Sequence, residues 1–217
     1  MKRYFILGTD TDCGKTHVTC QLIDFLKENQ QRVHAIKPVA SGCVAGVSED
    51  VLALNTHLGH LSEGDEKRFW RLIRPISPHL AALEEGVALS THLIAEACQQ
   101  QPSVDLDYLL IEGAGGLMVP LNAHETWIDF FILTKIPVIL VVGIRLGCIN
   151  HALLTNFAMR SHGIECVGWV ANCLAPNELA VPEIIQTLTE KMGNPLAIIP
   201  FYNAEQCISK FESIISK

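Results

Sequence analysis

Short apolar runs recur along the chain and predict buried strands. They occupy residues 5–7, 33–36, 108–111, 137–142, 167–171 and 196–199. Most of these runs are continuously apolar instead of alternating with polar residues, which is typical of strands whose two faces are both covered. The pattern therefore predicts a sheet that is buried on both sides.

Between these runs, apolar residues recur at helical spacing, as Val18, Leu22 and Leu26 do. Helices are predicted over residues 15–29, 50–58, 79–85, 91–100, 127–134, 149–162, 182–192 and 204–216. The alternation predicts an α/β fold with a mostly parallel sheet and helices on both faces. Ligands of such sheets bind beyond the carboxyl ends of the strands, so residues that follow each strand are the functional candidates.

A glycine-rich stretch, Gly8-Thr9-Asp10-Thr11-Asp12-Cys13-Gly14-Lys15-Thr16, separates the first predicted strand from the first helix. Backbone N–H groups and the positive end of a helix dipole suit phosphate at such a turn. Lys15 adds a mobile positive charge, and Thr16 offers a hydroxyl to Mg²⁺. Because the flanking strand and helix are present, we predict a P-loop NTPase-type fold that binds a nucleotide. The alternative is a glycine turn that only caps a helix.

Polar residues after later strands add candidates. Lys37 leaves the second strand, where it either contacts a phosphate or is solvated. Glu112 ends the third strand, the position of a second carboxylate for Mg²⁺. Asn172 either pairs with a nucleobase or is an ordinary turn residue, and Asp50 alone is interpreted as a helix N-cap. The turn at Gly147 leads into a helix whose N–H groups either receive a carboxylate or simply begin the helix.

Composition and charge narrow the possible partners. With 217 residues and 49% hydrophobic content, we expect one domain over residues 1–217. A net charge of −7 without a lysine or arginine run argues against general affinity for nucleic acid or anionic membranes. The N-terminus shows no signal-peptide pattern, and the apolar stretch 136–144 is too short to span a membrane, so we expect a cytoplasmic protein. The eight scattered cysteines indicate neither a zinc site nor a disulfide framework.

Taken together and in this order, the motifs closely resemble those of the dethiobiotin synthetase family. Besides the phosphate loop, the resemblance rests on Lys37-Pro38-Val39-Ala40-Ser41-Gly42, Glu112-Gly113-Ala114-Gly115-Gly116, Leu146-Gly147-Cys148-Ile149-Asn150-His151 and Gly168-Trp169-Val170-Ala171-Asn172. It implies an ATP- and Mg²⁺-dependent cyclo-ligase of biotin biosynthesis. In that reaction CO2 joins 7,8-diaminononanoate as a carbamate, ATP converts the carbamate to a carbamic-phosphoric anhydride, and the second amine closes the ureido ring of dethiobiotin.

The resemblance also implies roles for individual residues. Lys15 and Lys37 are the implied catalytic residues, because they would neutralise the carbamate and the transferring phosphoryl oxygens. Thr16, Asp50 and Glu112 are the implied metal ligands. The family is a homodimer with its substrate site at the subunit interface, which implies the same assembly here.

Two sets of binding positions follow from the resemblance. The implied nucleotide-binding residues are Asp12, Cys13, Gly14, Lys15, Thr16, His17, Asp50, Glu112, Gly113, Ala114, Gly115, Asn172, Cys173, Pro200, Phe201 and Tyr202. The implied substrate-binding residues are Thr11, Ser41, Gly147, Cys148, Ile149 and Asn150. The last four would reach the substrate carboxylate of the neighbouring subunit.

Other classes of protein share parts of this pattern. A partitioning-type ATPase normally has a second lysine early in the loop, where this chain has Thr11 and Asp12. An amidoligase would carry a glutaminase domain, for which 217 residues leave little room. A catalytically silent nucleotide-binding module remains the third alternative, although it would not need both lysines and both carboxylates.

Overall fold

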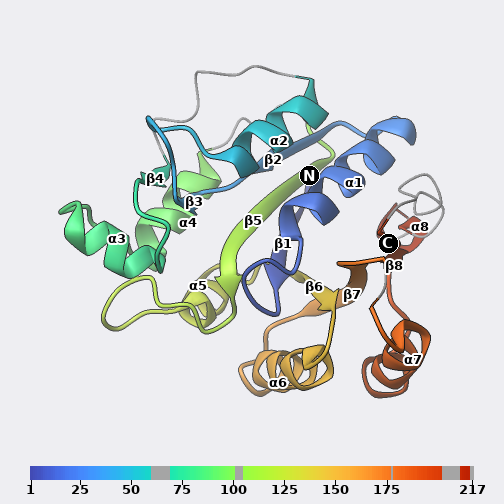
Figure 1. Cartoon of the computed structure of the whole chain (residues 1–217). Helices are drawn as coiled ribbons and strands as arrows, with labels where there is room; N and C mark the ends of the chain where they lie inside the picture. The colour runs from blue at the N-terminus through green and yellow to red at the C-terminus, as the bar shows by residue number, and fades with distance from the viewer. Residues whose placement is uncertain (60–68, 101–104, 177, 202–210, 216–217) are drawn as a thin grey trace.

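The computed structural model describes residues 1–59, 69–100, 105–176, 178–201 and 211–215 (Figure 1). Its main sheet has the strand order β2-β5-β1-β6-β7-β8, and every neighbouring pair is parallel. These strands are β2 (Val33–Ile36), β5 (Tyr108–Gly116), β1 (Lys2–Gly8), β6 (Val138–Ile144), β7 (Cys166–Cys173) and β8 (Ala197–Ile199). The predicted parallel sheet is therefore confirmed.

The strand order reverses at β1, which pairs with β5 on one side and with β6 on the other. The chain leaves β1 at Gly8 and enters α1 (Lys15–Glu28) through the glycine-rich loop. Because loops on either side of such a reversal diverge, a crevice forms beyond the carboxyl ends of the strands. The phosphate loop lies at this crevice.

Helices cover both faces of the sheet because side chains along β1 alternate between two apolar clusters. Ile6 packs in the cluster that contains α1, α2 (Glu49–Leu58) and α8 (Glu212–Ile215). Phe5 and Leu7 pack in the cluster on the opposite face. The helices of that second face are α3 (Pro78–Glu84), α4 (Thr91–Gln99), α5 (Trp127–Thr134), α6 (Cys148–Ser161) and α7 (Val181–Met192). Figure 1 shows α1 and α2 together on one side of the sheet, away from α6.

A second, two-stranded parallel sheet was not expected from the sequence. It pairs β3 (Val39–Ser41) with β4 (Trp70–Leu72). Three-residue strands carry too little periodicity to be recognised, and their pairing partner is distant in sequence. This small sheet fixes the chain after Pro38, because Trp70 N donates to Pro38 O at 2.8 Å.

Two details of the helices differ from expectation. The N-cap of α2 is Ser48, so Asp50 lies in the first turn of the helix and its interpretation as an N-cap is wrong. Of the helix expected over residues 204–216, the structure describes α8 and Phe211, which lies in a turn, whereas residues 204–210 and 216 lie outside the described residues. Within the described part of the chain, no helix combines the length and apolarity needed to span a membrane.

Phe5 anchors the core beneath the site. Its ring lies 5.1 Å from that of Trp127, 5.4 Å from Phe130 and 4.8 Å from Phe131, and it is fully buried. We expect Phe5→Ala to lower the free energy of unfolding by about 3–5 kcal/mol, because it leaves a cavity among these rings. Urea denaturation measures this change. The exposed Leu179→Ala is the control, with a change of about 0.5 kcal/mol or less, and equal effects of the two variants would contradict the packing described here.

Candidate active site

The phosphate loop leaves the N-terminus of α1 open to an anion. Gly14 is the N-cap, in the left-handed region at φ 85°, and α1 has neither a side-chain cap nor an acidic residue in its first turn. The first N–H groups of the helix therefore lack intrahelical and side-chain partners, which is the arrangement that receives phosphate. The loop is held from behind, because Asn172 Nδ2 donates to Cys13 O at 3.0 Å and Thr9 N donates to Val141 O at 3.0 Å.

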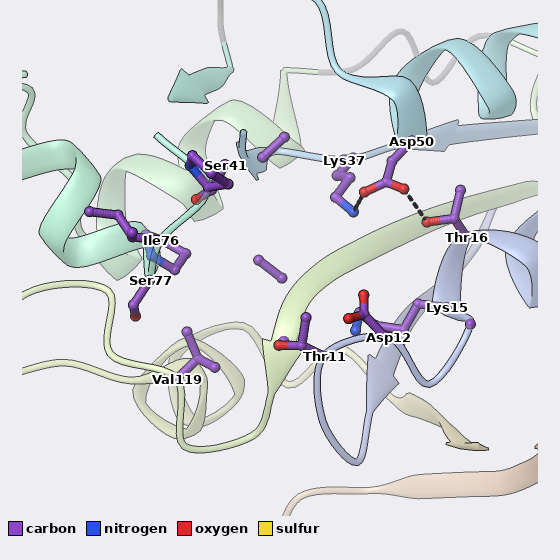
Figure 2. Close-up of a pocket in the computed structure, with 16 residues that line it drawn as sticks. Thr11, Asp12, Lys15, Thr16, Lys37, Ser41, Asp50, Ile76, Ser77 and Val119 are labelled. Atoms are coloured by element: carbon purple, nitrogen blue, oxygen red, sulfur yellow. Dashed lines mark hydrogen bonds and ion pairs between the residues drawn. The ribbon is translucent and has the colours of Figure 1, made fainter. Parts of the chain in front are cut away.

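A cavity of about 830 Å³ opens beside this loop at the carboxyl ends of the strands (Figure 2). It is lined by Thr11, Asp12, Gly14, Lys15, Thr16, Lys37, Ala40, Ser41, Asp50, Pro75, Ile76, Ser77, Pro78, Ala114, Gly115 and Val119. Both predicted catalytic lysines and most of the predicted phosphate-loop residues thus face one space.

Four side chains from four segments meet at the floor of this cavity. Thr16 Oγ1 lies 2.9 Å from Asp50 Oδ1 and 2.7 Å from Glu112 Oε1. Lys37 Nζ donates to Glu112 Oε1 at 2.7 Å and also pairs with Asp50 Oδ2. Figure 2 shows Asp50 between Lys37 and Thr16, linked to both. We call Thr16, Lys37, Asp50 and Glu112 the charge cluster.

Within the charge cluster, burial and the neighbouring charges together set the pKa values of Lys37 and Asp50. The Lys37 side chain is 6% exposed and Glu112 is fully buried. Burial by itself lowers the pKa of Lys37, but the carboxylates of Glu112 and Asp50 outweigh it, so this pKa is raised. Burial likewise raises the pKa of Asp50, but the Lys37 charge outweighs it, and the pKa of Asp50 is lowered. Lys37 and Asp50 are therefore both ionised at neutral pH.

The donor set fits Mg²⁺. Glu112 Oε2 is buried and has no hydrogen-bond partner among the described residues, although a buried carboxylate oxygen normally has one. Mg²⁺ in nucleotide sites takes one or two carboxylates and completes its shell with phosphate oxygens and water. The described residues contain no cluster of three histidine, cysteine or acidic ligands. The oxygens of Thr16, Asp50 and Glu112 therefore suit an ion that is shared with a nucleotide.

The remaining predicted nucleotide residues that the structure describes do not line the cavity. Cys13 is buried in the core, and His17 is exposed on α1. A Cβ at Gly113 would lie 2.5 Å from Phe5 Cε1, so this glycine permits close packing of β5 on β1. Cys173 ends β7, and Pro200 and Phe201 follow β8. Tyr202 lies outside the described residues.

The predicted carboxylate-binding segment lies apart from the 830 Å³ cavity. Gly147 is the N-cap of α6, and Cys148, Ile149 and Asn150 form its first turn. Like α1, this helix has neither a side-chain cap nor an acidic residue in its first turn. A separate cavity of about 480 Å³ lies between the phosphate loop, residues 116–120 and the part of α6 that includes His151.

Sequence reasoning missed the apolar wall of the main cavity. Ile76 and Val119 face it, together with Pro75, Ser77 and Pro78 (Figure 2). Residues 75–78 follow β4, which pairs with β3, a strand distant from it in sequence, and so their place beside the phosphate loop leaves no local signal. The cavity therefore combines a charged floor with an apolar side.

Comparison with known proteins decides the family. A family model described as an AAA domain matches residues 2–205. The ATP-dependent dethiobiotin synthetase BioD of Legionella pneumophila (strain Paris) is 50% identical over 200 residues, which cover 90% of this chain and 92% of the relative. The protein of the same name from Nitrosospira multiformis is 39% identical over 201 residues, which cover 92% of this chain and 88% of the relative. The chain belongs to the dethiobiotin synthetase family.

Solved structures agree on the fold of this family member. The MinC:MinD cell division protein complex of Aquifex aeolicus superposes with a TM-score of 0.62 at 15% identity, covering 100% of this chain and 97% of that chain. Cell division protein FtsY of Thermotoga maritima superposes with a TM-score of 0.59 at 13% identity, and the match covers 100% of this chain and 69% of that chain. Such identities show the fold alone. The predictions of a P-loop NTPase-type fold and of an enzyme of the dethiobiotin synthetase type are confirmed.

Gly14 offers a direct test of the loop geometry. Its φ of +85° strains any L side chain, and a Cβ would lie 2.0 Å from Asn172 Nδ2. We expect Gly14→Ala to weaken binding of a fluorescent ATP analogue by at least about tenfold, because the loop must move from Asn172. Gly163→Ala is the matched control: its φ is +64°, but no heavy atom lies within 4 Å of the added Cβ. Unchanged affinity in Gly14→Ala would refute the loop geometry.

Proposed function

We propose that this enzyme carries out the ring-closing carboxylation of 7,8-diaminononanoate with CO2, ATP and Mg²⁺. The observation that carries the proposal is that Lys15, Lys37 and Asp50 line one cavity whose other side is apolar, with the buried Glu112 paired to Lys37. A phosphate site alone would need only the loop. The second buried lysine and the apolar side suit an anionic, carbon-rich second substrate.

In the proposed mechanism, residues of this chain stabilise the negative charges that form and position the reacting groups. Lys37, buried and protonated, would stabilise the carbamate that forms when one amine adds to CO2. Lys15 and the N–H groups of the loop would hold the γ-phosphoryl group of ATP, which the carbamate oxygen attacks with ADP as the leaving group. The second amine then attacks the carbamate carbon, and phosphate leaves. Thr16, Asp50 and Glu112 would hold Mg²⁺, which when bound would neutralise charge on the phosphate oxygens.

Two further residues suit the positioning of the diamine. Ser41 Oγ is buried and has no hydrogen-bond partner among the described residues, and Ser41 lines the cavity. Thr11 lines the same cavity from the phosphate loop. Ile76 and Val119 would contact the alkyl chain, because apolar walls bind carbon chains by removing them from water.

The base of the nucleotide is proposed to lie near the ends of β7 and β8. Asn172 and Cys173 end β7, and Pro200 and Phe201 follow its neighbour β8. Asn172 Nδ2 already donates one hydrogen bond to the phosphate loop, so its carbonyl oxygen and its second N–H would remain for the edge of the adenine ring. The cytoplasmic location expected from the sequence stays a prediction.

A homodimer is part of the proposal because α6 exposes apolar side chains beside the predicted carboxylate segment. Phe157 is 70% exposed and Leu154 is 59% exposed, one helical turn apart on α6, and Leu146 before the helix is 95% exposed. Large exposed apolar side chains that cluster on one face are typical of a protein interface. Pairing through α6 would bring the N-terminus of α6, with Gly147 and Asn150, to the partner's cavity.

The reaction itself is tested with purified protein, ATP, Mg²⁺ and labelled bicarbonate, with and without 7,8-diaminononanoate. We expect acid-stable label and phosphate to appear together, and only when the diamine is present. Phosphate release that ignores the diamine would instead support a switch ATPase. Bound nucleotide with neither signal would support a silent nucleotide-binding module.

Lys37→Ala tests the catalytic lysine. We expect kcat to fall by at least about a hundredfold, because the charge that stabilises the carbamate is lost, while ATP-analogue affinity stays within about threefold. Steady-state kinetics and a direct binding titration measure the two effects. Lys191→Ala removes a lysine on the exposed surface of α7 and serves as the control. Normal turnover of Lys37→Ala would exclude this role.

Phe157→Glu tests the dimer. A charge in an apolar interface costs desolvation and disrupts packing, so we expect this variant to sediment as a monomer of about 24 kDa where the unmodified chain sediments as a dimer. Sedimentation velocity gives the masses. Leu83→Glu changes an exposed leucine on α3 and should leave the dimer intact. A monomeric unmodified chain, or a dimeric Phe157→Glu, would rule out this interface.

A further inference from the structure

Asp10 connects two loops that follow neighbouring parallel strands. It lies in the phosphate loop after β1, and its Oδ2 accepts a hydrogen bond from Arg145 Nη2 in the turn after β6. The same oxygen lies 3.8 Å from Nδ1 of His151, in the second turn of α6. One carboxylate oxygen thus faces two basic side chains on either side of the α6 N-terminus.

On the side of the phosphate loop, Asp10 contacts the residue that serves phosphate. Its backbone carbonyl accepts a hydrogen bond from Lys15 Nζ at 3.0 Å. Its Oδ1 accepts a second bond from Thr9 Oγ1 at 3.2 Å. These two hydrogen bonds fix Asp10 within the phosphate loop, and its side chain connects the loop to the turn after β6.

On the side of α6, Arg145 closes the turn that begins the helix. Its backbone carbonyl accepts a hydrogen bond from Cys148 N at 3.0 Å, across Gly147, whose φ is +90°. The next anchor is weaker, because Leu146 N donates to Glu178 Oε1 at 3.3 Å on the exposed surface. The Asp10–Arg145 ion pair ties the turn that begins α6 to the nucleotide site, and the longer contact of Asp10 with His151 adds to it.

We propose that Asp10 and Arg145 are positioning residues that fix the first turn of α6 against the phosphate loop, so that this turn is held ready for a carboxylate. The inference rests on the proposed function, in which Gly147 to Asn150 receive the substrate carboxylate. The Asp10 side chain is 23% exposed and that of Arg145 is 41% exposed. Ion pairs of such exposure contribute little to global stability. We therefore expect loss of this ion pair to change the position of the first turn of α6 and the affinity for substrate, and not the free energy of unfolding.

The test uses Asp10→Asn, Arg145→Met, the double variant and Arg145→Lys in the full-length enzyme. We expect each single neutral variant to raise KM for the diamine about tenfold, with kcat and KM for ATP within about twofold, because misplaced donors cost binding. The double variant should be no worse than Asp10→Asn alone, since Asp10→Asn already removes the ion pair with Arg145. Arg145→Lys should retain most of the affinity, because the ammonium restores the charge opposite Asp10.

Amide hydrogen exchange supplies a readout that needs no turnover. We expect the peptide that contains residues 145–151 to exchange several-fold faster in Asp10→Asn and Arg145→Met than in the unmodified enzyme. Arg32→Met is the matched control, since Arg32 forms an exposed ion pair with Asp107 at 3.1 Å before β2. It should change neither KM nor this exchange.

The outcomes separate the two proposals. Additive KM effects in the double variant, or unchanged exchange of residues 145–151 in the neutral variants, would overturn the positioning role. An unmodified enzyme that fixes no carbon would overturn the proposed function instead, while the exchange of residues 145–151 would still decide whether Asp10 and Arg145 order the turn.

Discussion

The ion pair of buried Lys37 with Asp50 and Glu112 is the interaction on which the site depends. Burying either charge alone costs several kcal/mol, so each is tolerated only beside its partner. The sheet supplies this proximity: Ile36 pairs with Ile111, which sets Lys37 beside Glu112, and Ile6 pairs with Glu112, which brings the phosphate loop to the same edge. Thr16 on α1 and Asp50 on α2 complete the cluster from above the sheet.

The strand reversal at β1 gives the phosphate loop two functional neighbours. Toward β5 and β2 lie the charge cluster and the large cavity, where the chemistry is proposed to occur. Toward β6 lie Arg145 and the first turn of α6, where the carboxylate of a partner's substrate is proposed to bind. In the proposed dimer, one loop would serve both halves of the site, and Asp10 would join the two sides.

The sequence allowed the main sheet and the phosphate loop to be predicted because their signals are local. Continuous apolar runs predict buried strands, and the Gly14-Lys15-Thr16 motif predicts the loop. The role of Asp50 is not local: its position resembles an N-cap, and only packing of α2 on α1 turns its side chain toward Thr16 and Lys37. The β3–β4 pair and the apolar wall at Ile76 were missed for the same reason, since their partners are distant in sequence.

Thr16, Asp50 and Glu112 are proposed to form one metal site with the nucleotide, with Lys37 beside it. A crystal structure with Mn²⁺ and a non-hydrolysable ATP analogue tests this most directly, because the anomalous signal of manganese locates the ion independently of the protein density. We expect a single peak within coordination distance of these side-chain oxygens and the β- and γ-phosphates, with Lys37 Nζ directed at the phosphate end of the cavity. A peak that contacts the phosphates but none of these three residues would contradict it.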